Sequence, residues 1–112
     1  MAIAEPFFRV SATGAEKVLH SFGSGSDGEG PVPGLTQLNG LLCGTTRNGG
    51  MYGDGTVFSI SRSDTEKVLH SFGSGSDGKP PTAGLIDVNG TLYGTTFVGG
   101  THGKGTVFAL TP

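Results

Sequence analysis

The amino-acid sequence predicts an all-β fold built from repeated four-stranded units. Three observations support this prediction. The chain repeats itself after 50 residues, its β-branched and aromatic residues concentrate in short segments between glycine-rich turns, and no stretch of ten residues shows the 3.6-residue period of an amphipathic helix. Glycine supplies 22 of the 112 residues, a share about three times the usual value of about 7%.

The repeat is visible without any gap. The segment EKVLHSFGSGSDG at 16–28 recurs unchanged at 66–78, and residues 13–62 match residues 63–112 at 29 of 50 positions. We therefore divide the chain into an N-terminal extra strand at 1–12, a first repeat at 13–62 and a second repeat at 63–112. Ten of the twelve glycines of the first repeat recur in the second. This regularity favours turns and bulges over disorder.

Each repeat contains four predicted strands, which we name D, A, B and C in chain order. An Asn-Gly pair separates strands A and B in both repeats. It predicts a two-residue hairpin turn, because both residues tolerate a positive φ. The predicted strands are Glu16–Phe22, Gly34–Leu38, Leu41–Thr46 and Thr56–Ser61, followed by Glu66–Phe72, Gly84–Val88, Thr91–Thr96 and Thr106–Leu110.

Four strands in 50 residues is the size of one β-propeller blade. A propeller needs about four to eight blades, so two blades cannot close a ring. We predict closure by homo-oligomerisation, with a six-bladed homotrimer favoured over an eight-bladed homotetramer. One blade consists of strands A, B and C followed by strand D of the next repeat. The last blade, at 84–110, therefore lacks strand D, and Glu16–Phe22 of a neighbouring copy is expected to complete it. The segment Pro6–Ser11 would then lie outside the donated strand as a fifth strand, or be partly disordered.

The repeat also resembles a known family. The segments Gly90–Thr96, Gly99–Gly100 and Gly105–Phe108 read GTLYGTT, GG and GTVF, and they are similar to the GloVer tandem repeat of bacterial surface proteins. In the first repeat, Cys43 stands where this motif has tyrosine. The resemblance implies a kelch-like, propeller-type repeat in exported bacterial proteins. The family has no well-established activity, so the resemblance supplies no catalytic residues. We expect no cofactor.

Composition excludes several function classes. The net charge of −2 and the pI near 5.8 give no basic surface for nucleic acid. No run of 18 apolar residues predicts a membrane-spanning helix. Cys43 is the single cysteine, which excludes an intrachain disulfide and a cysteine-based metal cluster. The N-terminal residues show no secretory signal, so the sequence leaves the compartment open.

The candidate ligand-binding residues come mainly from the long connections. Strand direction alternates within a blade, so the D–A and B–C connections are expected on one face, where function tends to reside. The aromatic and amide groups there suggest carbohydrate. A single carboxylate in each SGSDG loop favours a turn over a Ca²⁺ site. The candidates are Arg47, Asn48, Tyr52, Tyr93, Phe97, His102, Asp27 and Asp77.

Two further residue types have structural interpretations. His20 and His70 are expected to pack on one face of strand D, each with one nitrogen hydrogen-bonded. The threonine pairs at 45–46 and 95–96 are expected to make ladder and loop hydrogen bonds.

Three functional hypotheses follow from the sequence. The favoured one is a non-catalytic binding module that assembles into a multivalent ring. The second is a structural propeller fragment without a ligand. The third is an enzyme with an inter-subunit or central-channel site. No arrangement of catalytic residues stands in a recognisable context, so the enzyme hypothesis ranks last.

Overall fold

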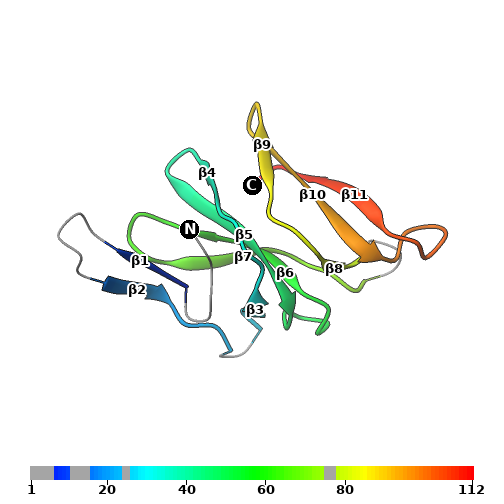
Figure 1. Ribbon diagram of the computed structural model, residues 1–112, viewed down its shortest axis with the longest axis horizontal. Coiled ribbons are helices and arrows are strands. Elements are labelled where there is room, and N and C mark those ends of the chain that lie inside the picture. The colour runs from blue at the N-terminus through cyan, green and yellow to red at the C-terminus, as the bar shows by residue number, and fades with distance from the viewer. Residues whose placement is uncertain (1–6, 11–15, 24–25, 75–77) are drawn as a thin grey trace.

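The computed structural model describes residues 7–10, 16–23, 26–74 and 78–112, with residues 7–10 and 16 described through their backbone. Within these ranges the chain forms eleven strands and no helix, which confirms the predicted all-β class. The strands make a two-stranded, a five-stranded and a four-stranded sheet. These sheets follow one another in chain order across the long axis of the molecule (Figure 1).

The central sheet is an antiparallel meander in the order β4–β5–β6–β7, and β3 pairs with the other half of β5. It combines strands A, B and C of the first repeat with strand D of the second. The central sheet therefore crosses the boundary between the two sequence repeats. Its strands are β3 (Glu29–Pro31), β4 (Thr36–Leu38), β5 (Leu41–Asn48), β6 (Thr56–Ile60) and β7 (Glu66–Ser71).

The last sheet repeats the same pairing 50 residues later, but it stops one strand short. Gly44 lies opposite Phe58 in the central sheet, and Gly94 lies opposite Phe108 in the last one. No strand in the described part of the chain pairs with the outer edge of β11. Its strands are β8 (Lys79–Pro81), β9 (Ile86–Val88), β10 (Thr91–Val98) and β11 (Thr106–Leu110).

The first sheet is a hairpin of β1 (Phe7–Val10) and β2 (Glu16–His20). Phe8 lies opposite Val18, as Phe58 lies opposite Val68, and the register shifts at the same place in both pairs. In the single chain, β1 thus takes the place of strand C beside β2. It does so because residues 8–10 align with 58–60 and follow the same pairing pattern. The outer position expected for this segment concerns the assembly and stays a prediction.

Strands β3 and β8 were not predicted. Their sequences, EGP and KPP, have low β-propensity, and proline removes a backbone donor. They form by pairing with β5 and β10, respectively. Each lies at a sheet edge, where proline is tolerated because one side of the strand needs no backbone donor. Their pairing extends β5 to Asn48 and β10 to Val98, two residues beyond the predicted ends.

Both Asn-Gly turns have the predicted conformation. The φ values are 50° at Asn39 and 81° at Gly40, and 54° at Asn89 and 88° at Gly90. Positive φ at both central residues is the signature of a type I′ turn, whose twist suits a two-residue hairpin. The turns fix the register of β4 on β5 and of β9 on β10.

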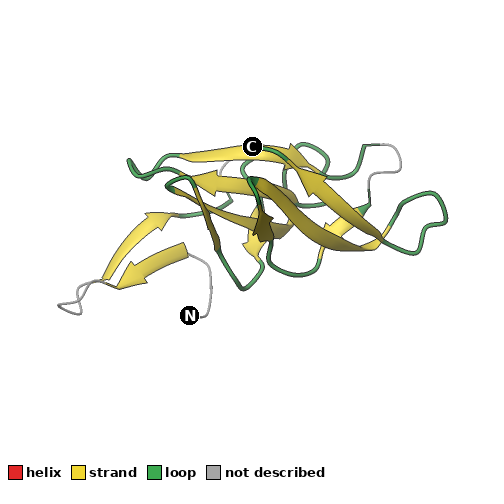
Figure 2. Cartoon of the chain, turned by 90° about the horizontal axis from the view of Figure 1, so that it is seen from above, coloured by secondary structure: helices red, strands yellow, loops and turns green. Residues whose placement is uncertain are grey.

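The hydrophobic core lies between successive sheets. Leu19 of β2 packs with Phe58 and Ile60 of the central sheet. The β1–β2 hairpin, near the N-terminus, lies at one end of the molecule (Figure 2). The second cluster joins the central and last sheets, and its buried members are Leu38, Cys43, Val57, Phe72, Leu85 and Leu92. The two junctions share one ring contact, because the Phe22–Phe58 and Phe72–Phe108 ring pairs both have centroids 5.1 Å apart and planes at 65°.

Candidate functional site

The long connections meet at one end of each sheet, as predicted. A Cβ atom added to Gly49, in the B–C connection, would lie 2.7 Å from the Cα of Gly28, in the D–A connection. The equivalent glycines, Gly99 and Gly78, are in contact in the same way. Only residues without a side chain fit this close approach, which explains why these glycines recur.

Threonines secure the base of these connections. The hydroxyl of Thr46 donates to the Asn48 carbonyl at 3.0 Å and accepts the backbone N–H of Thr56 at 3.1 Å. The hydroxyl oxygens of Thr46 and Thr56 are 2.8 Å apart. Thr96 and Thr106 repeat this network in the last sheet. For Thr46 and Thr96, the expected ladder and loop hydrogen bonds are confirmed.

Asp27 acts within its own loop. One of its carboxylate oxygens lies 2.9 Å from His20 Nε2, and the other accepts the backbone N–H of Gly23 at 3.2 Å. This confirms the turn interpretation of Asp27 and the hydrogen-bonded packing of His20. Asp77 lies outside the described residues. Within the described ranges, no group of three or more His, Cys, Asp or Glu residues could hold a metal ion.

The other candidates divide into separate groups. Tyr52 is half exposed and lines a hollow of about 510 Å³ with Met51, His70 and several serines. Phe97 and His102 are exposed on the last sheet and its B–C connection. Arg47 and Asn48 are exposed at the end of β5. The structure corrects their placement in loops, because β3 and β8 draw residues 47–48 and 97–98 into strands.

Residues that the prediction missed also line the Tyr52 hollow. They are Ser26, Met51, Val68, Leu69, His70, Ser71 and Ser74. The change from Met51-Tyr52 to Thr101-His102 between the repeats is a sequence signal for this region. The serines give no such signal, since SGS recurs unchanged.

Tyr93 lies elsewhere, on the outer face of the last sheet. It shares this face with Ile86, Val88 and Val107, and all four are exposed. We call these four residues the open face. Their equivalents in the central sheet are Thr36, Leu38, Cys43 and Val57, which face the last sheet. The difference in exposed fraction is largest between Val57, which has no exposed surface, and Val107, which is 78% exposed.

The free edge of β11 borders a second apolar feature. A groove of about 210 Å³ is lined by Val57, His70, Phe72, Phe108, Ala109 and Leu110, and we call it the edge groove. Phe58 and Ile60 are buried in the central sheet, where β7 covers the equivalent edge. Phe108 and Leu110 are only half buried. The edge groove therefore lies beside the place that a strand D would occupy.

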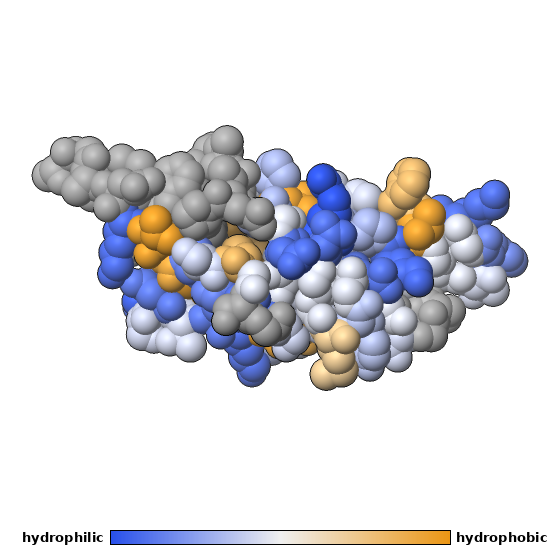
Figure 3. Space-filling model, turned by 90° about the horizontal axis from the view of Figure 1, so that it is seen from below, coloured by the Kyte–Doolittle hydropathy of each residue, from blue (hydrophilic) through white to orange (hydrophobic). Residues whose placement is uncertain are grey.

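At the opposite end of the molecule, the described hairpin has no strands A and B, the strands that the last sheet does contain. Leu35 and Leu42 are half buried against the β1–β2 hairpin, whereas their equivalents Leu85 and Leu92 are buried against the central sheet. The difference arises because the hairpin supplies strands C and D but neither A nor B. We call Leu35, Leu42 and the exposed Val18 the first end. On the side drawn in Figure 3, apolar side chains form separate patches between hydrophilic ones.

Two ionisable groups, the buried Cys43 and the half-buried Glu66, have shifted pKa values. Burial, with a smaller contribution from Asp87, raises the pKa of the Cys43 thiol, which is fully enclosed in the core. Burial also raises the pKa of Glu66, where nearby His20 acts in the opposite direction. Glu66 Oε2 is buried and has no hydrogen-bond partner among the described residues. Neither group lies in the Tyr52 hollow, the open face or the edge groove.

No helix in the described part of the chain could cross a membrane. Comparison with curated proteins and with solved structures gave no match. Residues 6–112 match the Gloeobacter/Verrucomicrobia repeat. This match spans the hairpin and both larger sheets, and it agrees with the resemblance seen in the repeat motifs. The chain therefore belongs to the Gloeobacter/Verrucomicrobia repeat family.

Proposed function

We propose that this protein is a non-catalytic binding module whose copies associate head to tail into a β-propeller ring, with a trimer of six blades favoured. The observation that carries the proposal is the open face. Its central-sheet equivalents, including Val57 and Cys43, have no exposed surface because the last sheet covers them. A second copy that packs in the same way would cover Val107 and Tyr93.

The two ends of the chain are complementary. In the described part of the chain, the last sheet has strands A, B and C without D, while the hairpin offers strand D as β2 without A and B. Docking the last sheet of one copy on the first end of another would cover Leu35 and Leu42. It would also place β2 beside the edge groove. This contact joins two different surfaces, so it is heterologous and closes a ring when the rotation permits.

The closing contact differs from the internal one at three of the four open-face positions, of which the change from Leu38 to Val88 is conservative. Thr36 donates its hydroxyl to the Leu85 carbonyl across the internal junction, and Cys43 is buried there. Ile86 and Tyr93 take these positions on the open face. The closing contact is thus more apolar and bulkier than the internal one. Exposed apolar side chains gathered on one face are typical of an interaction surface.

The proposed ligand is a carbohydrate bound in the Tyr52 hollow. Its volume of about 510 Å³ falls in the range of about 300–1,000 Å³ typical of small-ligand sites. The phenol ring of Tyr52 provides an apolar surface, and Ser26, Ser71 and Ser74 provide hydroxyl groups. A ring would present several such hollows, so that weak individual sites gain avidity.

Two variants of similar exposure test the assembly. Val107 on the open face is 78% exposed and Phe97, outside it, is 70% exposed. We expect Val107→Asp to yield a folded monomer, because association would bury an unpaired carboxylate. Phe97→Asp should leave the assembly intact. Light scattering measures the mass and circular dichroism the fold. Equal masses for the two variants would contradict the proposal.

A glycan array tests the ligand. We expect binding by the wild-type assembly, loss of binding in Tyr52→Ala and retention in His102→Ala, the equivalent position of the second repeat. An intact assembly that binds no glycan would instead support the structural fragment without a ligand.

A further inference from the structure

In the proposed assembly, two strands compete for the same edge of β2. If β2 keeps its place on the central sheet, the β11 of a neighbouring copy must lie along the edge of β2 that belongs to strand C. That edge is already occupied by β1, in the same register that β6 adopts on β7. One strand must leave before the other can pair.

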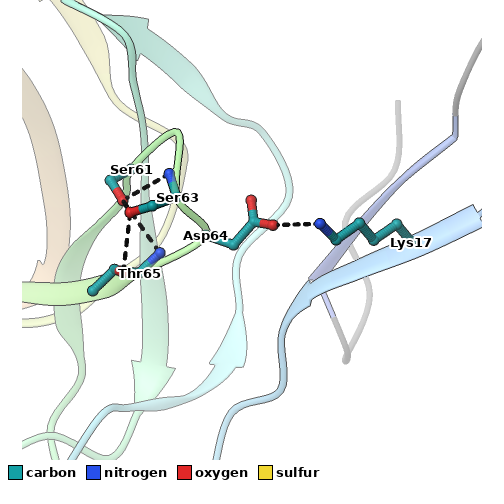
Figure 4. A network of polar contacts seen from close by, with 5 residues as sticks. All are labelled: Lys17, Ser61, Ser63, Asp64 and Thr65. Carbon is teal, nitrogen blue, oxygen red and sulfur yellow. Dashed lines mark hydrogen bonds and ion pairs between the residues drawn. The ribbon is translucent and has the colours of Figure 1, made fainter.

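The contacts of β2 favour its staying. Lys17 Nζ lies 2.8 Å from a carboxylate oxygen of Asp64, in the turn that a network of Ser61, Ser63 and Thr65 holds together (Figure 4). Leu19 is buried against the central sheet. Just beyond the strand, Phe22 packs edge-on against Phe58.

By contrast, β1 pairs with β2 and with no other strand in the described part of the chain. An isolated two-stranded hairpin is marginally stable in water. The backbone register sets Arg9 opposite Lys17. In the equivalent register, Ala109 of a neighbouring copy would stand opposite Lys17.

We infer that β1 is an exchangeable strand, which occupies the edge of β2 in the single chain and is displaced by β11 of a neighbouring copy on assembly. The inference rests on the proposed head-to-tail association and specifies how it forms. Because β11 brings the rest of its sheet, the exchange also covers Leu35 and Leu42, which β1 leaves half exposed. In this way β1 acts as an internal competitor of self-association.

Crosslinking tests the register. In Lys17→Cys/Ala109→Cys, a short thiol-reactive crosslinker should join neighbouring copies into a covalent ladder. The internal equivalent, Ser59→Cys/Lys67→Cys, should crosslink within one chain, because Ser59 lies opposite Lys67 and both line one surface hollow through which the reagent can enter. Cys43 is fully buried and should not react. An assembly that forms without the 17–109 crosslink, while the 59–67 control reacts, would overturn the exchange.

Locking and removing β1 test the competition. Crosslinked Arg9→Cys/Lys17→Cys, in which β1 cannot leave, should remain monomeric, whereas the same variant before crosslinking should assemble. Deleting residues 1–11 should lower the dissociation constant of the assembly by about tenfold or more. A tenfold change corresponds to about 1.4 kcal/mol of lost β1–β2 pairing free energy. Assembly of the locked chain as tight as that of the unlocked chain would also overturn the exchange.

These outcomes separate the two proposals. If the wild-type chain and the unlocked variant are both monomeric at all concentrations, the head-to-tail association fails and the exchange fails with it. If they assemble and the locked chain assembles equally well, the association stands and the exchange alone is wrong.

Discussion

The central and last sheets are built from repeats that match at 29 of 50 positions, but they lie in different surroundings. Phe58 and Phe108 occupy equivalent places on β6 and β11, opposite Gly44 and Gly94. Phe58 is fully buried because β7 covers its edge, and Phe108 is half buried beside a free edge. The comparison shows that the repeat determines the sheet, whereas burial depends on what lies next to it.

The largest expected effect is the loss of a core ring. Phe58→Ala should destabilise the protein by about 3–5 kcal/mol, the usual cost of removing a buried aromatic side chain. Phe108→Ala should cost less in the monomer, because its ring is half exposed there. In the assembly its cost should rise with protein concentration. Urea denaturation at two concentrations measures both costs, and equal costs at the lower concentration, with the chain monomeric, would contradict the open-edge description.

A smaller effect is expected at the threonine networks. Thr46→Val leaves the backbone N–H of Thr56 without its acceptor, which should cost about 1–3 kcal/mol. Thr96→Val should cost about the same, because Thr96 makes the equivalent bonds and is also buried. Thermal unfolding of the two variants makes the comparison. A much smaller cost at Thr96 would mean that the last sheet is loosened beyond its open edge.

The cost of replacing the turn glycines should be the same in the central and last sheets. Gly40→Ala and Gly90→Ala each place a side chain at positive φ, which should cost about 1–2 kcal/mol. At Gly40 the new methyl group meets only the movable side chain of Arg62, and at Gly90 it meets open space. Equal destabilisation in chemical denaturation is therefore expected, and a large difference would show that a turn contacts a neighbouring copy.

The smallest effect concerns pH. Burial raises the pKa of Glu66 in the folded protein above its unfolded value. Stability should therefore fall as the pH rises from the unfolded towards the folded pKa, because the unfolded chain releases the proton first. Glu66→Gln should be more stable than wild type at neutral pH and should lose this part of the pH dependence. The exposed Glu29→Gln serves as control, and an unchanged profile in Glu66→Gln would contradict the assignment.

Sequence reasoning predicted most of the fold because the repeat is local and regular. The Asn-Gly turns and the strands around GTVF have signatures that neighbouring residues fully determine. Strands β3 and β8 escaped prediction because Glu29–Pro31 and Lys79–Pro81 form strands only through pairing with β5 and β10. The place of β1 escaped too, since strand pairing across a connection is not encoded in propensity.

The candidate site was predicted in part. The turn role of Asp27 and the junction role of Thr46 followed from known side-chain preferences. Tyr93 was grouped with loop residues because it is aromatic, but alternation along β10 directs it to the open face. That face could not be recognised from sequence, because Val57 and Val107 are the same residue in equivalent segments.

The central claim is that a second copy completes the last sheet. Sedimentation equilibrium of the wild-type chain tests it most directly, since the chain mass is 11.3 kDa. We predict a closed assembly with three times this mass, or four times for the eight-bladed alternative, that dissociates on introducing Val107→Asp. A folded wild-type chain that stays at 11.3 kDa over the whole concentration range would contradict the claim.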